Sequence, residues 1–265
     1  MLRLFVVLTL FGTAYTHAQE DSASLGSIVL SDAKTVWIDA GRIFSAPARF
    51  QSGDWIETGG IAGGTAVLFS VDESARSLAL RNQSQFGDRF FDVGRQYGGF
   101  VYPGIIMGGL YIGGLAFRNT DVRLTGVYVF ESVAFAGAIT SVLKSAFGRS
   151  RPYLEEGNTT FRSMEFKTDN TSLPSGHATI AFAISSCLSG RIKNTWASVG
   201  LYSLAALTAA SRVYHDEHWF SDTFLGAAIG TAVGMSVAHL HDEDRRGSSL
   251  RIFPTIQGLR AELTF

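Results

Sequence analysis

The stretch from residue 173 to residue 190 has the sequence LPSGHATIAFAISSCLSG and joins a tight turn to an apolar segment. The turn carries Ser175, a residue type that often caps helix N-termini, and residues 178–190 carry no charge. These 13 residues are fewer than the roughly 20 that a helix needs to cross a bilayer. We therefore expect a buried helix that begins close to this turn.

Five further apolar segments are long enough to form helices. One of them, 96–117, is uncharged over 22 residues and is long enough to span a bilayer by itself. Together the segments predict an all-α protein, a bundle of about six core helices. The five segments are 59–71, 96–117, 124–143, 194–211 and 223–240.

Glycines recur at four-residue spacing in two of these segments. Small residues at this spacing allow two helix backbones to approach closely. We expect these glycines to be packing contacts and not a ligand site. They are Gly104 and Gly108, Gly109 and Gly113, and Gly226, Gly230 and Gly234.

The composition favours a membrane-compatible scaffold. Of the 265 residues, 46% are apolar and 17% are charged, against roughly 25% charged in an average soluble domain. The 22 Lys and Arg residues nearly balance the 23 Asp and Glu residues, so no basic field exists to hold nucleic acid, and we expect no such partner. The single cysteine, Cys187, excludes an intramolecular disulfide.

The N-terminal part of the chain has the pattern of a leader followed by an amphipathic segment. Residues 1–18 combine Arg3, an apolar run and small residues before a cut after Ala18, which predicts a secretory signal peptide; an uncleaved membrane anchor is the alternative. Residues 19–57 form the amphipathic segment. Within it, 31–55 predicts one helix that lies on a core or on a membrane surface.

The C-terminal part differs again. Apolar and polar residues alternate in the tail, 241–265, around a Pro and Gly turn, which predicts a short β-like hairpin. The helical domain then covers 58–240.

One ionisable residue lies inside an apolar segment. Glu131 is costly there unless it is paired or near water, so both a structural pairing and a functional role are open.

A dense group of cations follows the segment 124–143. Lys144 and Arg151 are seven residues apart, which places them on one face if the helix continues, whereas Pro152 disfavours helix at the preceding residue. The group therefore favours either an anion site or a charged helix end that complements the helix dipole.

The turn quoted above is a second candidate anion site. Gly176 leaves the backbone open, and the free N–H groups of a first helical turn attract an anion. His177 would then stand beside the bound anion. Ordinary capping by Ser175 is the alternative interpretation.

A third cluster occupies 211–222. His218 and Asp222 are spaced i,i+4, so on a helix the carboxylate would accept a hydrogen bond from one ring nitrogen and leave the other free as a nucleophile. A metal site built from His215, Asp216 and His218 competes with this interpretation. No ligand motif supports it, and we expect no metal.

In this order the clusters form the pattern Lys-x6-Arg-Pro, Pro-Ser-Gly-His and Ser-Arg-x5-His-x3-Asp. The chain thereby resembles the type 2 phosphatidic acid phosphatase superfamily, which also includes bacterial class A acid phosphatases and vanadium haloperoxidases. The resemblance extends over roughly 58–240. The pattern is matched without a gap at Lys144, Arg151, Pro152, 174–177, Ser211, Arg212, His218 and Asp222.

The resemblance implies roles for these residues. His218 would attack phosphorus and form a phosphohistidine, Asp222 would orient it, and His177 would protonate the leaving alcohol and then activate water. Arg149 and His215 lie outside the pattern and remain candidate substrate contacts. No metal or cofactor is implied. The phosphoryl oxygens would be held by Lys144, Arg151, Ser175, Gly176 and Arg212.

The function implied is that of a metal-independent phosphatase that hydrolyses a phosphate monoester or pyrophosphate of a membrane lipid. We expect it in a bacterial-type cell envelope, in the membrane with a periplasm-facing site. The alternatives are a soluble periplasmic acid phosphatase, a vanadium haloperoxidase and a non-catalytic envelope protein.

Overall fold

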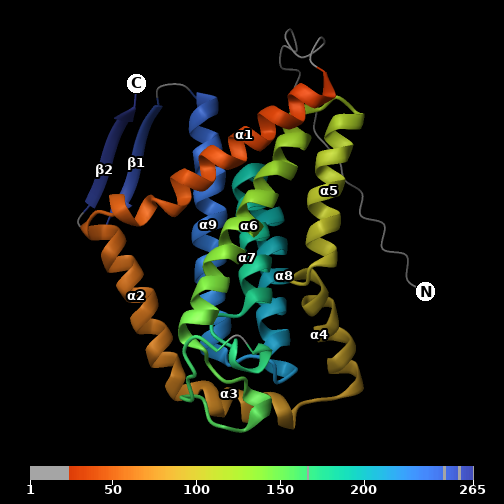
Figure 1. Cartoon of the computed structure of the whole chain (residues 1–265), viewed down its shortest axis with the longest axis vertical. Helices are drawn as coiled ribbons and strands as arrows, with labels where there is room; N and C mark the ends of the chain where they lie inside the picture. Colours follow the sequence, from red (N-terminus) through yellow and green to blue (C-terminus); the bar gives the residue numbers. More distant parts are fainter. Residues whose placement is uncertain (1–23, 166, 247–248, 256–257, 265) are drawn as a thin grey trace.

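The computed structural model describes residues 24–165, 167–246, 249–255 and 258–264, so the predicted signal peptide lies outside the described residues. The fold is an all-α bundle, as predicted (Figure 1). After the last helix, strands β1 (Ser249–Thr255) and β2 (Gly258–Thr264) pair in antiparallel fashion. The helices are α1 (Leu25–Phe44), α2 (Ser52–Leu68), α3 (Asp72–Arg81), α4 (Gln85–Tyr97), α5 (Val101–Ala116), α6 (Thr120–Phe147), α7 (Gly176–Ile192), α8 (Thr195–Tyr214) and α9 (Phe220–Arg246), with short 3-10 turns at Ala46–Arg49, Phe69–Val71, Pro152–Leu154 and Thr168–Asn170.

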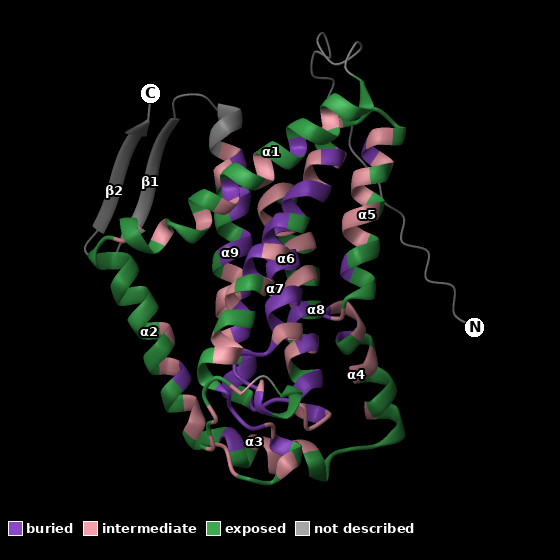
Figure 2. Ribbon diagram, in the orientation of Figure 1, coloured by how far each residue is buried: buried purple, intermediate pink, exposed green. Residues whose placement is uncertain are grey.

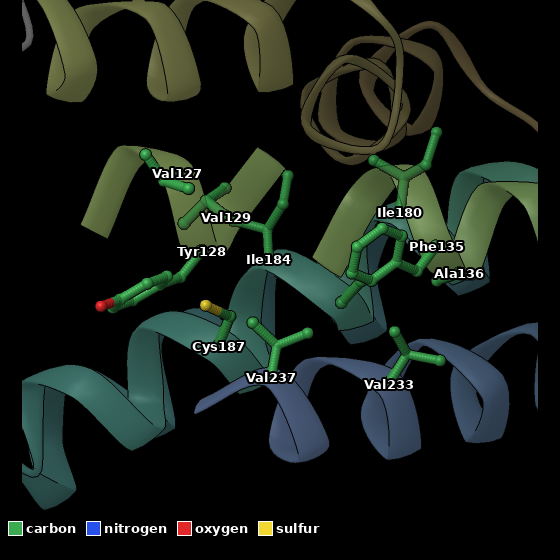
Figure 3. Packing of buried hydrophobic residues seen from close by; sticks show 11 residues of the cluster. Val127, Tyr128, Val129, Phe135, Ala136, Ile180, Ile184, Cys187, Val233 and Val237 are labelled. Carbon is green, nitrogen blue, oxygen red and sulfur yellow. The ribbon is translucent and has the colours of Figure 1, made fainter. Parts of the chain in front are cut away.

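Helix α7 forms the centre of the bundle, and α6, α8 and α9 pack against it. Residues 178–187 of α7 are buried, except for Phe182 (Figure 2). Ile184 and Cys187 are fully buried and belong to one apolar cluster with Val129 of α6 and Val237 of α9 (Figure 3). The prediction of a buried helix after the 173–177 turn is therefore confirmed.

The glycines of α9 lie against the backbone of α7. A Cβ at Gly226 would lie 2.5 Å from the carbonyl oxygen of Ser175, and Cβ atoms at Gly230 and Gly234 would overlap the carbonyl oxygens of Thr179 and Ala183. Only glycine allows this separation between the two helices. The predicted close packing is confirmed here.

The glycines of α5 behave differently. A Cβ at any of the four positions predicted to pack closely would meet no atom within 4 Å. The expectation of helix contacts there is wrong, because four-residue spacing marks a helix face but does not say whether another helix covers it. The α5 glycine that does touch a neighbouring backbone is Gly114, whose added Cβ would meet the backbone of Arg123.

The amphipathic segment 31–55 is not one helix. Helix α1 ends at Phe44, a 3-10 turn containing Pro47 follows, and α2 begins at Ser52. Proline has no backbone N–H and restricts the residue before it, which ends α1 here. Helix α1 is anchored to the bundle by Asp32, which accepts hydrogen bonds from Arg123 and, at 2.9 Å, from the hydroxyl of Tyr111.

Two helices in the described part of the chain are long and apolar enough to cross a membrane, α6 and the part of α9 that ends at Asp242. Helices α4 and α5 together form a third candidate, bent by 45° at their junction. The uncharged segment 96–117 is therefore not one straight helix, since α4 ends at Tyr97 and α5 starts at Val101.

We expect Gly230→Ala to lower the free energy of unfolding by about 1–3 kcal/mol, because the added methyl group forces α9 away from α7. Gly108→Ala on α5 is the matched control, with no atom within 4 Å of its new Cβ, and should be neutral or stabilising by up to about 1 kcal/mol. Thermal or denaturant unfolding of the detergent-solubilised protein measures both. Equal effects of the two substitutions would contradict the close α7–α9 contact.

Candidate active site

The charged clusters of the sequence meet at one end of the bundle, where α6 ends and where α7 and α9 begin (Figure 1). Two backbone hydrogen bonds join the segments. The N–H of Ser175 donates to the carbonyl of Asp222 at 2.9 Å, and the N–H of Ser172 donates to the carbonyl of Arg149 at 3.0 Å. Segments that are far apart in the sequence thus form one site.

Burial and nearby cations keep the two histidines of the site neutral. His218 is 3% exposed, and its pKa lies well below the usual 6.5 because burial disfavours the charged ring and surrounding cations repel it. Burial, and then Arg212 and Arg151, lower the pKa of His177 to about 3. Lys144 acts on both rings in the same direction. The three cations expected to hold phosphoryl oxygens therefore act on both histidines.

Two of these cations are organised by Glu217, a residue that the sequence patterns do not single out. Its Oε2 accepts a hydrogen bond from Nη1 of Arg151 and lies 3.5 Å from Nη2 of Arg212. Burial lowers the pKa of Arg212 to about 10, so it stays charged at neutral pH, and its buried Nε has no hydrogen-bond partner. Lys144 donates to the carbonyl of Thr171. Buried cations with an unused donor suit an anionic ligand.

In the turn before α7, the side-chain hydroxyl of Ser175 makes no hydrogen bond within the protein. Ser175 stands at the N-cap position, but its side chain makes no capping hydrogen bond, and its buried Oγ has no partner. A Cβ on Gly176 would point toward Lys144, 3.7 Å from its Cε. The capping interpretation therefore does not account for Ser175, whose hydroxyl is available to a ligand.

His218 lies before α9, which begins at Phe220, so the expected i,i+4 helical pair with Asp222 is not formed. Nδ1 of His218 is 3.6 Å from Oδ2 of Asp222, which is too long for a hydrogen bond. Instead, Ser172 Oγ lies 3.4 Å from Nδ1 and donates to Oδ2 at 2.5 Å. The N–H of Trp219 also donates to Oδ2, at 2.9 Å. Because Nδ1 faces this acidic side, Nε2 is the ring nitrogen left for chemistry.

Arg149 lies beneath the site and does not contact solvent, so the expectation of a substrate contact is wrong. Its side chain is 0% exposed, with Nη1 donating to Oδ1 of Asp222 at 2.6 Å and Nη2 to Oδ2 of Asp72 at 2.7 Å. The guanidinium also stacks over the ring of Phe69 at 4.1 Å. Arg149 therefore fixes one oxygen of Asp222 while Ser172 bonds to the other.

The alternative metal site at the end of α8 is not assembled. Asp216 accepts two hydrogen bonds from Arg76, at 2.7 and 2.8 Å, and is turned into that ion pair. His215 is the C-cap residue that follows α8, and its pKa is lowered by burial and then by Arg212. Its buried Nε2 has no partner, and its role as a substrate contact stays a prediction.

The structure adds three residues that the sequence patterns do not mark. Ser172 and Glu217 stand within two residues of the motifs, and this proximity is the signal that could have found them. Asp72 carries no such signal, because it lies far before the first motif and outside every apolar segment, one residue after the end of 59–71.

Comparison with known proteins gives matches for this region. Residues 125–246 match the family model of the PAP2 superfamily. A lipid A 1-phosphatase of Porphyromonas gingivalis is 28% identical over 170 residues, which are 63% of this chain and 34% of that protein. A lipid A 1-phosphatase of Rhizobium etli is 32% identical over 110 residues, 40% of this chain and 45% of that protein. The chain thus spans between about a third and about half of these relatives.

Two solved structures share the fold. A transmembrane PAP2 type phosphatidylglycerolphosphate phosphatase from Bacillus subtilis has a TM-score of 0.55 and 18% identity, covering 70% of this chain and 95% of that one. LpxE of Aquifex aeolicus has a TM-score of 0.50 and 23% identity, covering 64% and 95%. With its candidate spans, the chain is a membrane protein that shares this fold. Over residues 125–246, the chain is similar to the PAP2 superfamily, in line with the resemblance found in its motifs.

Proposed function

We propose that this protein is a metal-independent phosphatase that hydrolyses a phosphate monoester or pyrophosphate of a membrane lipid through a phosphohistidine intermediate. One observation carries the proposal. Burial and the charges of Lys144, Arg151 and Arg212 keep His218 neutral, and the buried Oγ of Ser175, in the turn before α7, has no partner. Fixed cations around a neutral nucleophile stabilise the charge of a phosphoryl group in transfer.

The first step is attack by Nε2 of His218 on phosphorus. The bond between phosphorus and the lipid oxygen breaks, and His177 gives a proton to that oxygen. In the second step His177 takes a proton from water, the water oxygen bonds to phosphorus, and the P–N bond breaks. Inorganic phosphate leaves and neutral His218 is restored. Burial, and then the nearby cations, lower the pKa of His177. A bound phosphate dianion offsets the effect of the cations, so the protonation of His177 depends on the substrate.

A lipid is the substrate class that the surroundings favour. The site lies at the ends of α6 and α9, the two single helices that are long and apolar enough to span a membrane. The lipid A 1-phosphatases to which the chain is similar point in the same direction. A lipid that stays in the bilayer can present its phosphate to this end of the bundle.

The charges at the other end of the bundle support an outward-facing site. Arg118, Arg123, Arg191 and Lys193 all lie near the α5–α6 and α7–α8 connections, at the opposite ends of α6 and α7 from the histidines. Cytoplasmic ends of membrane helices carry an excess of Lys and Arg. The catalytic end would then face the periplasm.

We expect His218→Ala to lower kcat by at least about 10³-fold, because the nucleophile is removed. His177→Ala should lower kcat by about 10²–10⁴-fold, and far less with a substrate whose leaving group needs no protonation, such as a nitrophenyl phosphate. Phosphate release measures both variants. His239→Ala, an exposed histidine of α9, is the control that should keep full activity. Full turnover by purified His218→Ala would rule the mechanism out.

The pH profile tests whether the nearby cations lower the pKa of His218. Because burial, and then the nearby cations, hold the pKa of His218 well below 6.5, kcat/KM of the wild type should stay high as the pH falls below 6.5. Lys144→Gln removes one repelling charge, so the pKa of His218 rises and the acid limb should move to higher pH. Lys193→Gln, at the opposite end, should leave the limb in place. A limb that does not move in Lys144→Gln would contradict the proposed electrostatic coupling.

A substrate panel separates the candidate functions. We expect the detergent-solubilised protein to hydrolyse phosphatidate, phosphatidylglycerol phosphate, undecaprenyl pyrophosphate or lipid A with a higher kcat/KM than a soluble aryl phosphate. Equal or better use of the aryl phosphate would favour a general acid phosphatase instead. Vanadate should inhibit the enzyme; oxidation of bromide in the presence of vanadate and peroxide would show a haloperoxidase.

A further inference from the structure

A second cluster of ionisable residues lies at the end of the bundle opposite the catalytic site. It joins Asp39 of α1, Glu131 of α6 and His241 of α9, and one ligand atom from each lies within 4.8 Å of the others. All three residues are buried, with exposures of 1%, 0% and 4%. Nineteen residues of α9 separate His241 from Asp222, a rise of about 28 Å, so the cluster is distinct from the catalytic site.

Hydrogen bonds among these three side chains leave part of their hydrogen-bonding capacity unused. Nε2 of His241 lies 3.0 Å from Oε2 of Glu131 and 3.3 Å from Oδ2 of Asp39. A ring nitrogen carries at most one hydrogen and cannot donate fully to both carboxylates. The other oxygen of Glu131, Oε1, is buried and has no hydrogen-bond partner. A buried carboxylate oxygen without a partner points to a ligand that these three side chains do not supply themselves.

Two of the three distances between the ligand atoms match the edges of a metal coordination polyhedron. Tetrahedral oxygen and nitrogen ligands about 2.0–2.1 Å from a Zn²⁺ ion lie roughly 3.3 Å from each other. The two distances from Nε2 of His241 are close to this value. Neighbouring groups hold the ligands in place. The ring of Tyr128 stacks on His241 with 3.5 Å between centroids, and Arg42 donates to Oδ1 of Asp39 at 3.2 Å.

We propose that Asp39, Glu131 and His241 bind a divalent transition metal ion, with Zn²⁺ as the best match. The two carboxylates balance the charge of the ion, and a neutral imidazole is a ligand that zinc accepts readily. The ion would tie α1, which crosses the bundle in Figure 1, to α6 and α9. Its role is structural, and it takes no part in the phosphatase reaction.

The first experiment measures metal content. The full chain is purified without a polyhistidine tag and without chelator, equilibrated with Zn²⁺, dialysed and analysed by inductively coupled plasma mass spectrometry. We expect about one zinc ion per chain in the wild type and in His239→Ala, and a large loss in Glu131→Gln and His241→Ala. His239→Ala is the matched control because it removes an exposed histidine from the same helix. Wild type that retains no zinc would overturn the proposal, as would Glu131→Gln that retains as much zinc as wild type.

The second experiment needs only the wild type, so it does not depend on whether the variants fold. The protein is stripped with a chelator and then titrated with Zn²⁺ or Co²⁺. We expect the melting temperature to rise with Zn²⁺, since binding to the native state stabilises it, and Co²⁺ to give the visible absorption of a tetrahedral site. A melting temperature unchanged by Zn²⁺, together with no cobalt spectrum, would show that the cluster is held by ion pairs alone.

Discussion

The architecture of the site depends on the close contact between α7 and α9. Glycine at 226, 230 and 234 allows the α9 backbone to lie directly on that of α7, and the first of these contacts is with the carbonyl of Ser175 itself. The same contact places the N–H of Ser175 on the carbonyl of Asp222. Two motifs more than 40 residues apart thus meet because no side chain separates their helices. A larger distance between α7 and α9 would move the start of α7 away from His218.

A second constraint is the buried ionic network under the site. Asp222 is bonded through one oxygen to Arg149 and through the other to Ser172 and the backbone of Trp219. Such a network is costly to desolvate, and removing one partner typically costs about 3–5 kcal/mol. The network fixes the carboxylate of Asp222 in one orientation, so the carboxylate beside His218 cannot rotate. The network also extends to α3, because Asp72 bonds to Arg149 and to the hydroxyl of Ser221.

This extension connects the family region with the part of the chain before it. The residues that match the PAP2 superfamily begin at 125, whereas Asp72 and Phe69 precede them and still contact Arg149. Arg123 and Tyr111 likewise hold α1 through Asp32. The N-terminal helices are therefore an integral part of the bundle, since they supply hydrogen-bond partners to charged side chains buried in it.

Local sequence determined the parts of the protein that depend on neighbouring residues. Apolar runs predicted the helices, the turn at 173–177 predicted where α7 begins, and three spaced motifs predicted the charged groups of the site. The tertiary structure alone decided which glycines pack, because glycines recur at the same spacing in α5 and α9 and only those of α9 lie against the backbone of a neighbouring helix. It also decided that Ser172 stands between His218 and Asp222, and that Arg149 is buried and paired with Asp72. The physical reason is that periodicity describes one element, whereas desolvation and hydrogen-bond pairing depend on which elements meet.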